Sequence, residues 1–175
     1  NLVKQDKPAN QFAKELGLKL GATTTTAEKE LVNRCESILN ITHSLSKNER
    51  TAMLDCVEAM THGMVKYQGQ ETLEGLENQK EMDLYCYYVA GVVGIMLTKL
   101  FLEYGESWNT EAKLEMEVKA ISFGQGLQMT NIIKDFWTDR ERGACWLPRS
   151  TFEPLGVSLK IIDKENITQF KEGID

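Results

Sequence analysis

Two aspartates, Asp135 and Asp139, lie four residues apart in the segment NIIKDFWTDRERGACWLP, which covers residues 131–148. An α-helix advances by about 100° per residue, so side chains four apart lie on the same face. On this geometry the two aspartates share one polar stripe with three further side chains, Gln128, Asn131 and Arg142. The stripe is either the solvated side of an amphipathic helix or a site for a cation, and the spacing alone leaves both interpretations open.

Three details of the sequence argue against a merely solvated face. Gln128 and Asn131 are unusual on a merely wet face, where Lys and Glu favour the helix more. Gly124 and Gly126 each destabilise a helix interior by about 1 kcal/mol relative to Ala, which predicts that something approaches this backbone closely. Two carboxylates one turn apart also repel each other unless a cation lies between them.

A magnesium ion that carries a diphosphate suits these residues. Mg²⁺ prefers oxygen ligands, keeps several waters and commonly shares a phosphate with the protein. Lys134, Arg140 and Arg142 are close enough in the sequence to neutralise phosphate oxygens. The stripe therefore fits a diphosphate–magnesium site at Asp135 and Asp139, although taken alone it favours the solvated face.

A second segment, DLYCYYVAGVVGIMLTKLF at 83–101, is apolar on nearly every side, so we expect a central helix. Its small residues, Ala90, Gly91, Gly94 and Thr98, allow either a neighbouring helix or a hydrocarbon chain to come close. Tyr85 and Tyr88 place phenols in this apolar region, where each hydroxyl needs a partner. They are either core tyrosines or groups that face a cavity, where one could handle a proton or stabilise a cation through its ring.

The elements that must position these residues are predicted to be helices. Positions 9–147 contain no proline, and no useful stretch alternates with period two. Capping boxes at Thr25 with Glu28 and at Ser46 with Glu49 predict two helix starts. Further helices are expected at 8–16, 79–104 and 111–142. The prediction is an all-α bundle, with residues 1–175 forming a single helical domain.

Composition excludes several classes of function. The net charge of −6 argues against a nucleic-acid partner, because phosphate binding needs a basic surface. The four cysteines are widely spaced, which predicts reduced thiols, and His43 and His62 do not make a metal site. The longest uncharged stretch, Leu84 to Thr98, is short for a membrane span and typical of a buried core helix.

Both segments together resemble the squalene and phytoene synthase family, the head-to-head prenyltransferases. DLYCYYVAGVVG is similar to the family's tyrosine motif, D-x-Y-C-x-x-V-A-G-x-V-G. GQGLQMTNIIKDFWTDRERGACWLP is similar to its second aspartate-rich motif, Q-x-T-N-I-x-R-D-x-x-x-D, followed by R-G and an aromatic residue before Pro. The resemblance implies an all-α isoprenoid-synthase fold around a large apolar cavity, and Mg²⁺-dependent condensation of two allylic diphosphates.

The resemblance also implies roles for individual residues. Asp135 and Asp139 would hold Mg²⁺ and a substrate diphosphate, and Tyr85 would take part in the proton or cation chemistry. The remaining candidates would contact the substrate, and they are Gln128, Asn131, Lys134, Arg142, Ala90, Gly91 and Gly94. Lys134 stands where the motif usually has Arg, so its charge is kept but a two-pronged phosphate contact is lost.

Within the family, the motifs favour bacterial-type squalene synthase, which condenses two farnesyl diphosphates to presqualene diphosphate and squalene. NADPH as reductant is implied by the family only. The alternatives are a phytoene or dehydrosqualene synthase and a non-catalytic family member. A ferritin-like di-iron bundle is excluded because no Glu-x-x-His occurs.

The family's first aspartate-rich motif does not occur upstream of Tyr85, and the chain begins at Asn1 without Met. We therefore expect a fragment that lacks this motif and the C-terminal helices, and that is inactive alone. The expected location is the cytoplasm, with peripheral association at a membrane surface because the substrates are lipophilic.

Overall fold

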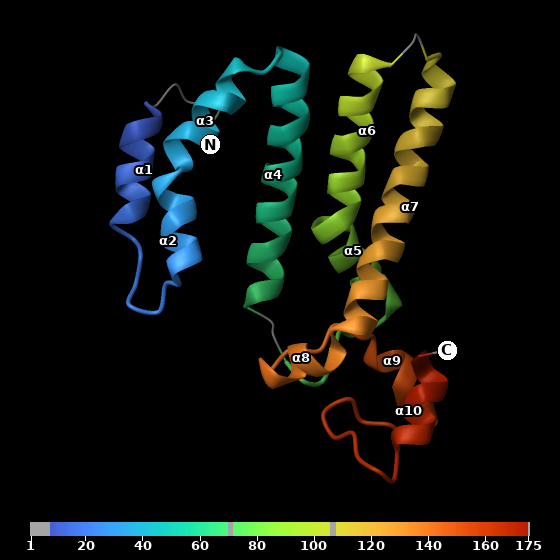
Figure 1. Ribbon diagram of the computed structural model, residues 1–175. Coiled ribbons are helices and arrows are strands. Elements are labelled where there is room, and N and C mark those ends of the chain that lie inside the picture. The colour runs from blue at the N-terminus through green and yellow to red at the C-terminus, as the bar shows by residue number, and fades with distance from the viewer. Residues whose placement is uncertain (1–7, 70–71, 106–107, 175) are drawn as a thin grey trace. The chain divides into compact units, whose positions relative to one another are not determined.

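The computed structural model describes residues 8–69, 72–105 and 108–174, and every regular element in these ranges is a helix (Figure 1). The predicted all-α class is therefore confirmed. The helices are α1 (Ala9–Gly17), α2 (Thr26–Asn33), α3 (Cys35–Ser44), α4 (Lys47–Gln68), α5 (Gln79–Cys86), the π-helical η1 (Tyr87–Gly91), α6 (Val92–Tyr104), α7 (Thr110–Lys134), α8 (Phe136–Glu141), α9 (Arg149–Phe152), the 3₁₀ turn η2 (Glu153–Leu155) and α10 (Ile167–Ile174).

The chain divides into two compact units, residues 1–54 and 55–175, and each is described by itself. That they form one domain stays a prediction. In the first unit, α1 packs against α2 and α3. Both predicted capping boxes are present: the Glu28 backbone N–H donates to Thr25 Oγ1 at 3.3 Å, and the Glu49 backbone N–H donates to Ser46 Oγ at 3.2 Å.

In the second unit, η1 and α6 run alongside α7 (Figure 1). Glycines make this close approach possible. A Cβ added at Gly124 would lie 2.5 Å from the Ala90 carbonyl oxygen, and one at Gly94 would lie 2.4 Å from the Ala120 carbonyl oxygen. Of the two explanations for the small residues, helix packing is therefore confirmed at Ala90 and Gly94, while their contact with a hydrocarbon chain stays a prediction.

Both long predicted helices are interrupted. The helix expected over 79–104 contains the π-helical turn Tyr87–Gly91, a wider turn that occurs frequently at functional sites. The helix expected over 111–142 is broken at Asp135, whose φ of −96° and ψ of 7° lie outside helical values. Asp135 is thus both the C-cap of α7 and the N-cap of α8.

The core of the second unit lies at the end of α7 that α5, α8, α9 and α10 approach (Figure 1). Its buried members are Tyr67, Leu76, Met82, Tyr85, Cys86, Ile132, Phe136, Cys145, Leu147, Phe152, Val157, Leu159 and Phe170. Two extended segments pair there, because the Leu76 N–H donates to the Leu147 carbonyl at 2.9 Å and the Arg149 N–H donates to the Leu76 carbonyl at 2.8 Å.

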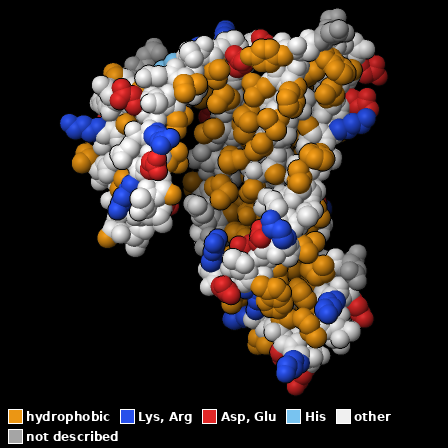
Figure 2. Space-filling view, viewed as in Figure 1, with side chains coloured by type: hydrophobic (Ala, Val, Ile, Leu, Met, Phe, Trp, Pro, Cys, Tyr) orange, Lys and Arg blue, Asp and Glu red, His pale blue; other side chains and the backbone are white. Residues whose placement is uncertain are grey.

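The helical run Gln79–Tyr104 is less buried than a core helix. It is long and apolar enough to cross a membrane, with a mean hydropathy of 1.6, and 28% of that window is buried. Core helices of soluble proteins pass the same test of length and composition, so this is weak evidence for a span. Hydrophobic side chains gather over α6 and α7 on the face in Figure 2, and Phe101 and Phe123 are 69% and 70% exposed.

Candidate functional site

The polar stripe follows the end of α7 and crosses into α8. The break at Asp135 does not shift its register, because the Asp135 N–H donates to the Asn131 carbonyl at 2.8 Å and the Asp139 N–H donates to the Asp135 carbonyl at 2.9 Å. Asn131, Asp135 and Asp139 are all half-buried, whereas Arg142 is exposed. The Asp135 side chain is 50% exposed, so a ligand from solvent can reach its carboxylate.

The charges in the stripe affect one another. Burial raises the pKa of Asp139 above its ordinary value, the Arg142 charge lowers it, and the Asp135 charge raises it. The Asp135 carboxylate is therefore close enough to disfavour ionisation of Asp139. A cation between them would relieve both the burial penalty and this repulsion.

Lys134 bridges two members of the stripe. Its Nζ lies 3.4 Å from Asp135 Oδ2 and donates to Asn131 Oδ1 at 3.3 Å. The Lys134 side chain is 64% exposed, so this ion pair contributes little stability and can be exchanged for another partner. A diphosphate near Asp135 would offer that partner.

The oxygen donors of the stripe fit Mg²⁺. Among the residues that the structure describes, no group of three or more His, Cys, Asp or Glu side chains could hold a metal ion by itself. Mg²⁺ is usually bound through one or two carboxylates plus waters and substrate phosphates. Asp135 and Asp139 supply two such carboxylates, and Asn131 adds a neutral amide oxygen one turn away.

Arg140, which was predicted to be available to phosphate, has a structural role instead. Its guanidinium donates to the Leu159 carbonyl and, at 3.1 Å, to the Lys160 carbonyl, and it lies 5.5 Å from the Phe136 ring centroid. It therefore holds the loop before α10 against α8. Arg140 directly follows Asp139 in α8 but lies outside the stripe, and its position in the sequence could not show which way its side chain points.

The predicted close approach to the glycines is confirmed at one of the two. The backbone of Ala90 in η1 packs directly against Gly124, since a Cβ added at Gly124 would lie 2.5 Å from the Ala90 carbonyl oxygen. No atom of the described residues comes within 4 Å of a Cβ placed at Gly126. Gly124 is therefore explained by helix packing.

Tyr85 is a buried aromatic residue, 6% exposed, between two other rings. It stacks on Trp146 with 4.3 Å between ring centroids and 6° between planes. Tyr67 meets it edge-on at 5.2 Å and 80°. Tyr88 lies elsewhere, against Gly63 of α4, where an added Cβ would be 2.3 Å from Tyr88 Cγ.

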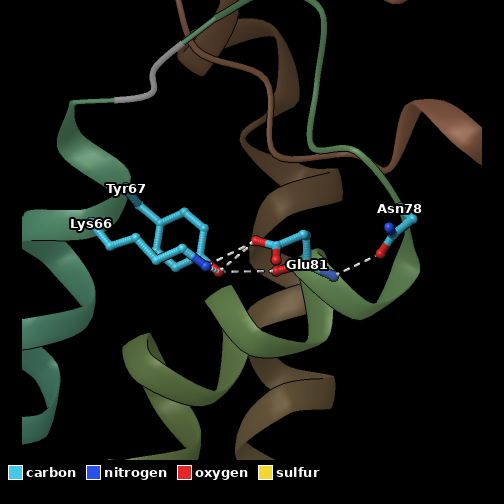
Figure 3. Close-up of polar contacts among 4 residues, drawn as sticks. All are labelled: Lys66, Tyr67, Asn78 and Glu81. Atoms are coloured by element: carbon cyan, nitrogen blue, oxygen red, sulfur yellow. Dashed lines mark hydrogen bonds and ion pairs between the residues drawn. The ribbon is translucent and has the colours of Figure 1, made fainter.

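Four polar residues at the contact between α4 and the start of α5 were not predicted from the sequence. Figure 3 shows Lys66 and Tyr67 of α4 reaching Glu81 of α5. Tyr67 Oη donates to Glu81 Oε2 at 3.2 Å, and Lys66 Nζ donates to the same oxygen at 3.1 Å. Asn78 caps α5 by accepting from the Glu81 N–H at 3.1 Å. No motif links these positions, and only their contact in space identifies them.

Comparisons with known proteins show which family the chain resembles. A profile of the squalene/phytoene synthase family matches residues 5–175. Squalene synthase ERG9 of Gibberella zeae is 34% identical over 124 residues, which are 70% of this chain and 26% of that protein. Squalene synthase ERG9 of Saccharomyces cerevisiae is 31% identical over 142 residues, 80% of this chain and 32% of that protein. Squalene synthase 1 of Arabidopsis thaliana is 35% identical over 129 residues, which are 73% of this chain and 29% of that protein.

Two solved structures share the fold. The complex of TcSQS with the ligand E5700 has a TM-score of 0.74 at 24% identity and covers 98% of this chain and 49% of that one. The complex with BPH1237 has a TM-score of 0.70 at 23% identity and covers 99% and 53%. The expected all-α isoprenoid-synthase fold is thereby confirmed.

The chain spans about a quarter to a third of the length of the curated relatives it matches. These relatives are eukaryotic, so the expected likeness to bacterial-type enzymes is corrected to a eukaryotic one. The family profile covers nearly all residues, and the Asp135–Asp139 stripe and Tyr85 lie within it. The chain belongs to the squalene/phytoene synthase family.

Proposed function

We propose that the whole protein joins two farnesyl diphosphates head to head and converts the product to squalene. The observation that carries this proposal is the half-buried pair of Asp135 and Asp139, kept in helical register across the α7–α8 junction. The squalene synthases among the relatives support the choice of product.

Asp135 and Asp139 would hold Mg²⁺ together with the substrate diphosphate. When bound, Mg²⁺ supplies positive charge that stabilises a departing diphosphate. Lys134 exchanges its contact with Asp135 for a phosphate oxygen, and Arg142 adds a second positive charge at the exposed end of the stripe. Gln128 and Asn131 orient the diphosphate through their amide groups.

Tyr85 lies in the apolar part of the site. Loss of diphosphate leaves an allylic cation, which the double bond of the second substrate attacks. A phenol in a water-poor aromatic cluster can hold or accept a proton there, and its ring can stabilise positive charge. Ala90, Gly91 and Gly94 would form part of the wall of the prenyl cavity, at the place where η1 and α6 pack closely against α7.

Family membership also underlies three further parts of the proposal: NADPH as the reductant, a cytoplasmic location and peripheral contact with a membrane surface. We assign none of the described residues to NADPH. The exposed hydrophobic side chains over α6 and α7 support contact with lipophilic substrates.

The experiment is a product analysis with the whole purified protein and radiolabelled farnesyl diphosphate. With Mg²⁺ and NADPH we expect squalene, and without NADPH we expect presqualene diphosphate to accumulate. Omitting Mg²⁺ should abolish both products. Turnover of geranylgeranyl diphosphate in preference would show a phytoene synthase instead, and absence of any product would show a non-catalytic member.

A further inference from the structure

Tyr85 has a buried ring that contacts rings from two other parts of the second unit. The ring itself belongs to α5, Trp146 belongs to the loop after α8, and Tyr67 belongs to α4. Parallel stacking restricts tilting of the Tyr85 ring, and the edge-on contact with Tyr67 restricts rotation within the plane. Together the two contacts fix one orientation for the phenol.

Trp146 is itself held on both sides by its backbone neighbours. The Cys145 N–H donates to the Thr72 carbonyl at 2.9 Å, and the Leu147 carbonyl accepts from the Leu76 N–H at 2.9 Å. These two bonds hold the backbone of Trp146, and the stacking contact with Tyr85 places its indole. Its position is therefore built into the fold.

The same loop starts at the aspartate stripe. The Ala144 N–H donates to the Asp139 carbonyl at 3.0 Å, two residues before Trp146. A short, hydrogen-bonded stretch thus connects the carboxylate pair to the ring that stacks on Tyr85. The diphosphate end and the tyrosine end of the site are set by one segment.

Polar contacts hold the hydroxyl end of the Tyr67 ring. It is 1% exposed, and its hydroxyl donates to Glu81 Oε2 while it accepts from Lys66 Nζ at 3.4 Å (Figure 3). Glu81 is in turn held by Lys66 and by its place in the first turn of α5, which Asn78 caps. These bonds keep the Tyr67 edge directed at Tyr85.

We propose that Trp146 and Tyr67 are positioning residues that hold Tyr85 in its reactive orientation, with the Lys66–Glu81 pair anchoring Tyr67. This inference rests on the proposed role of Tyr85. Neither residue touches the reacting atoms. Both act through the Tyr85 ring, so their loss changes the rate of the chemical step more than the binding of farnesyl diphosphate.

Steady-state kinetics of the whole protein test the first part. Trp146→Leu should lower kcat by about tenfold to a hundredfold, since a displacement of about 1 Å at a reacting group has effects of this size, with little change in KM. Trp146→Phe keeps a stacking ring and should restore most of the rate. Trp137→Leu is the matched control, because Trp137 lies in the same part of the chain but is 54% exposed and contacts Phe136 and Phe170. It should leave kcat unchanged.

A spectroscopic measurement tests the second part without activity. The whole protein is labelled with 3-fluorotyrosine, and the ¹⁹F resonance of Tyr85 is assigned by its loss in Tyr85→Phe. Trp146→Leu should shift this resonance, because the ring current of the stacked indole is gone. Tyr67→Phe keeps the ring but removes the bond to Glu81, and it should broaden the Tyr85 signal and lower kcat less than Trp146→Leu does.

An unchanged kcat and an unchanged Tyr85 resonance in Trp146→Leu would overturn the inference. If that variant does not fold, wild-type kcat and an unbroadened Tyr85 resonance in Tyr67→Phe would overturn it equally. The proposed function fails separately: wild-type activity in Tyr85→Phe would remove the role of Tyr85 itself, whereas an inactive Tyr85→Phe beside a fully active Trp146→Leu would refute positioning alone.

Discussion

Gly75 occupies the tightest point of the paired segments that carry Trp146. Its φ of +80° is in the left-handed region, and an added Cβ would lie 2.5 Å from the Leu147 carbonyl oxygen and 2.6 Å from Leu159 Cδ1. That carbonyl is the acceptor of the Leu76 N–H bond. Gly75→Ala therefore strains the backbone and also displaces the Leu147 carbonyl that accepts the Leu76 N–H bond.

The two effects can be separated in size. The left-handed conformation costs a non-glycine residue about 1 kcal/mol, and forcing a methyl group into a packed site adds about 2 kcal/mol. We expect Gly75→Ala to lower the free energy of unfolding by about 3 kcal/mol in total. Gly156→Ala is the matched control, because Gly156 has a φ of +72° but no described atom within 4 Å of its Cβ. It should lose only about 1 kcal/mol.

The assay is urea denaturation of the whole protein and both variants, followed by the midpoint and slope of each transition. The difference between the variants measures the clash with Leu147 and Leu159. Equal destabilisation in Gly75→Ala and Gly156→Ala would refute the close packing of the two segments. In the same samples, Gly75→Ala should also shift the ¹⁹F resonance of Tyr85, because the loop with Trp146 moves.

Three further predictions concern reactivity, packing and the isolated chain. Burial raises the pKa of Cys86 to about 12, so at pH 9 only about a thousandth of this thiol is ionised. Labelling of the native protein with iodoacetamide, followed by mass spectrometry, should therefore modify the half-buried Cys35 and leave Cys86 intact. Rapid labelling of Cys86 in the native protein would contradict its burial. Gly63→Ala places a methyl group 2.3 Å from Tyr88 Cγ and should lower the midpoint of urea unfolding by the equivalent of about 2 kcal/mol, whereas an unchanged midpoint would show that Tyr88 moves freely. The 175 residues alone should convert no farnesyl diphosphate, since the family's first aspartate-rich motif does not occur upstream of Tyr85, and measurable turnover by this chain would refute that expectation.

Local signals predicted much of this structure. The capping boxes at Thr25 and Ser46 were correct because a cap depends on residues within one turn of the chain. The four-residue spacing of Asp135 and Asp139 was likewise a local property, and the hydrogen bonds across the junction preserved it. Long apolar and polar periodicities gave the helices and their order.

Contacts between distant segments could not be predicted in this way. The stacking of Trp146 on Tyr85 joins residues about 60 positions apart, and the bonds from Arg140 to the loop at 159–160 depend on how that loop folds back. Periodicity did not predict the π-helical turn at 87–91 or the break at Asp135, because both depart from the regular repeat of an α-helix. The burial of Tyr67 was not predicted either, because its contacts with Glu81 and Tyr85 also join segments that are distant in the sequence.

The most direct test of the central claim compares three variants of the whole protein at increasing Mg²⁺ concentration. Asp135→Asn and Asp139→Asn remove the proposed ligands, and Glu141→Gln removes an exposed carboxylate of α8 that lies outside the stripe. Squalene formation from radiolabelled farnesyl diphosphate should collapse in both aspartate variants, recover little with added Mg²⁺, and stay at the wild-type level in Glu141→Gln. Wild-type rates in the aspartate variants would contradict the account and make the stripe a solvated helix face.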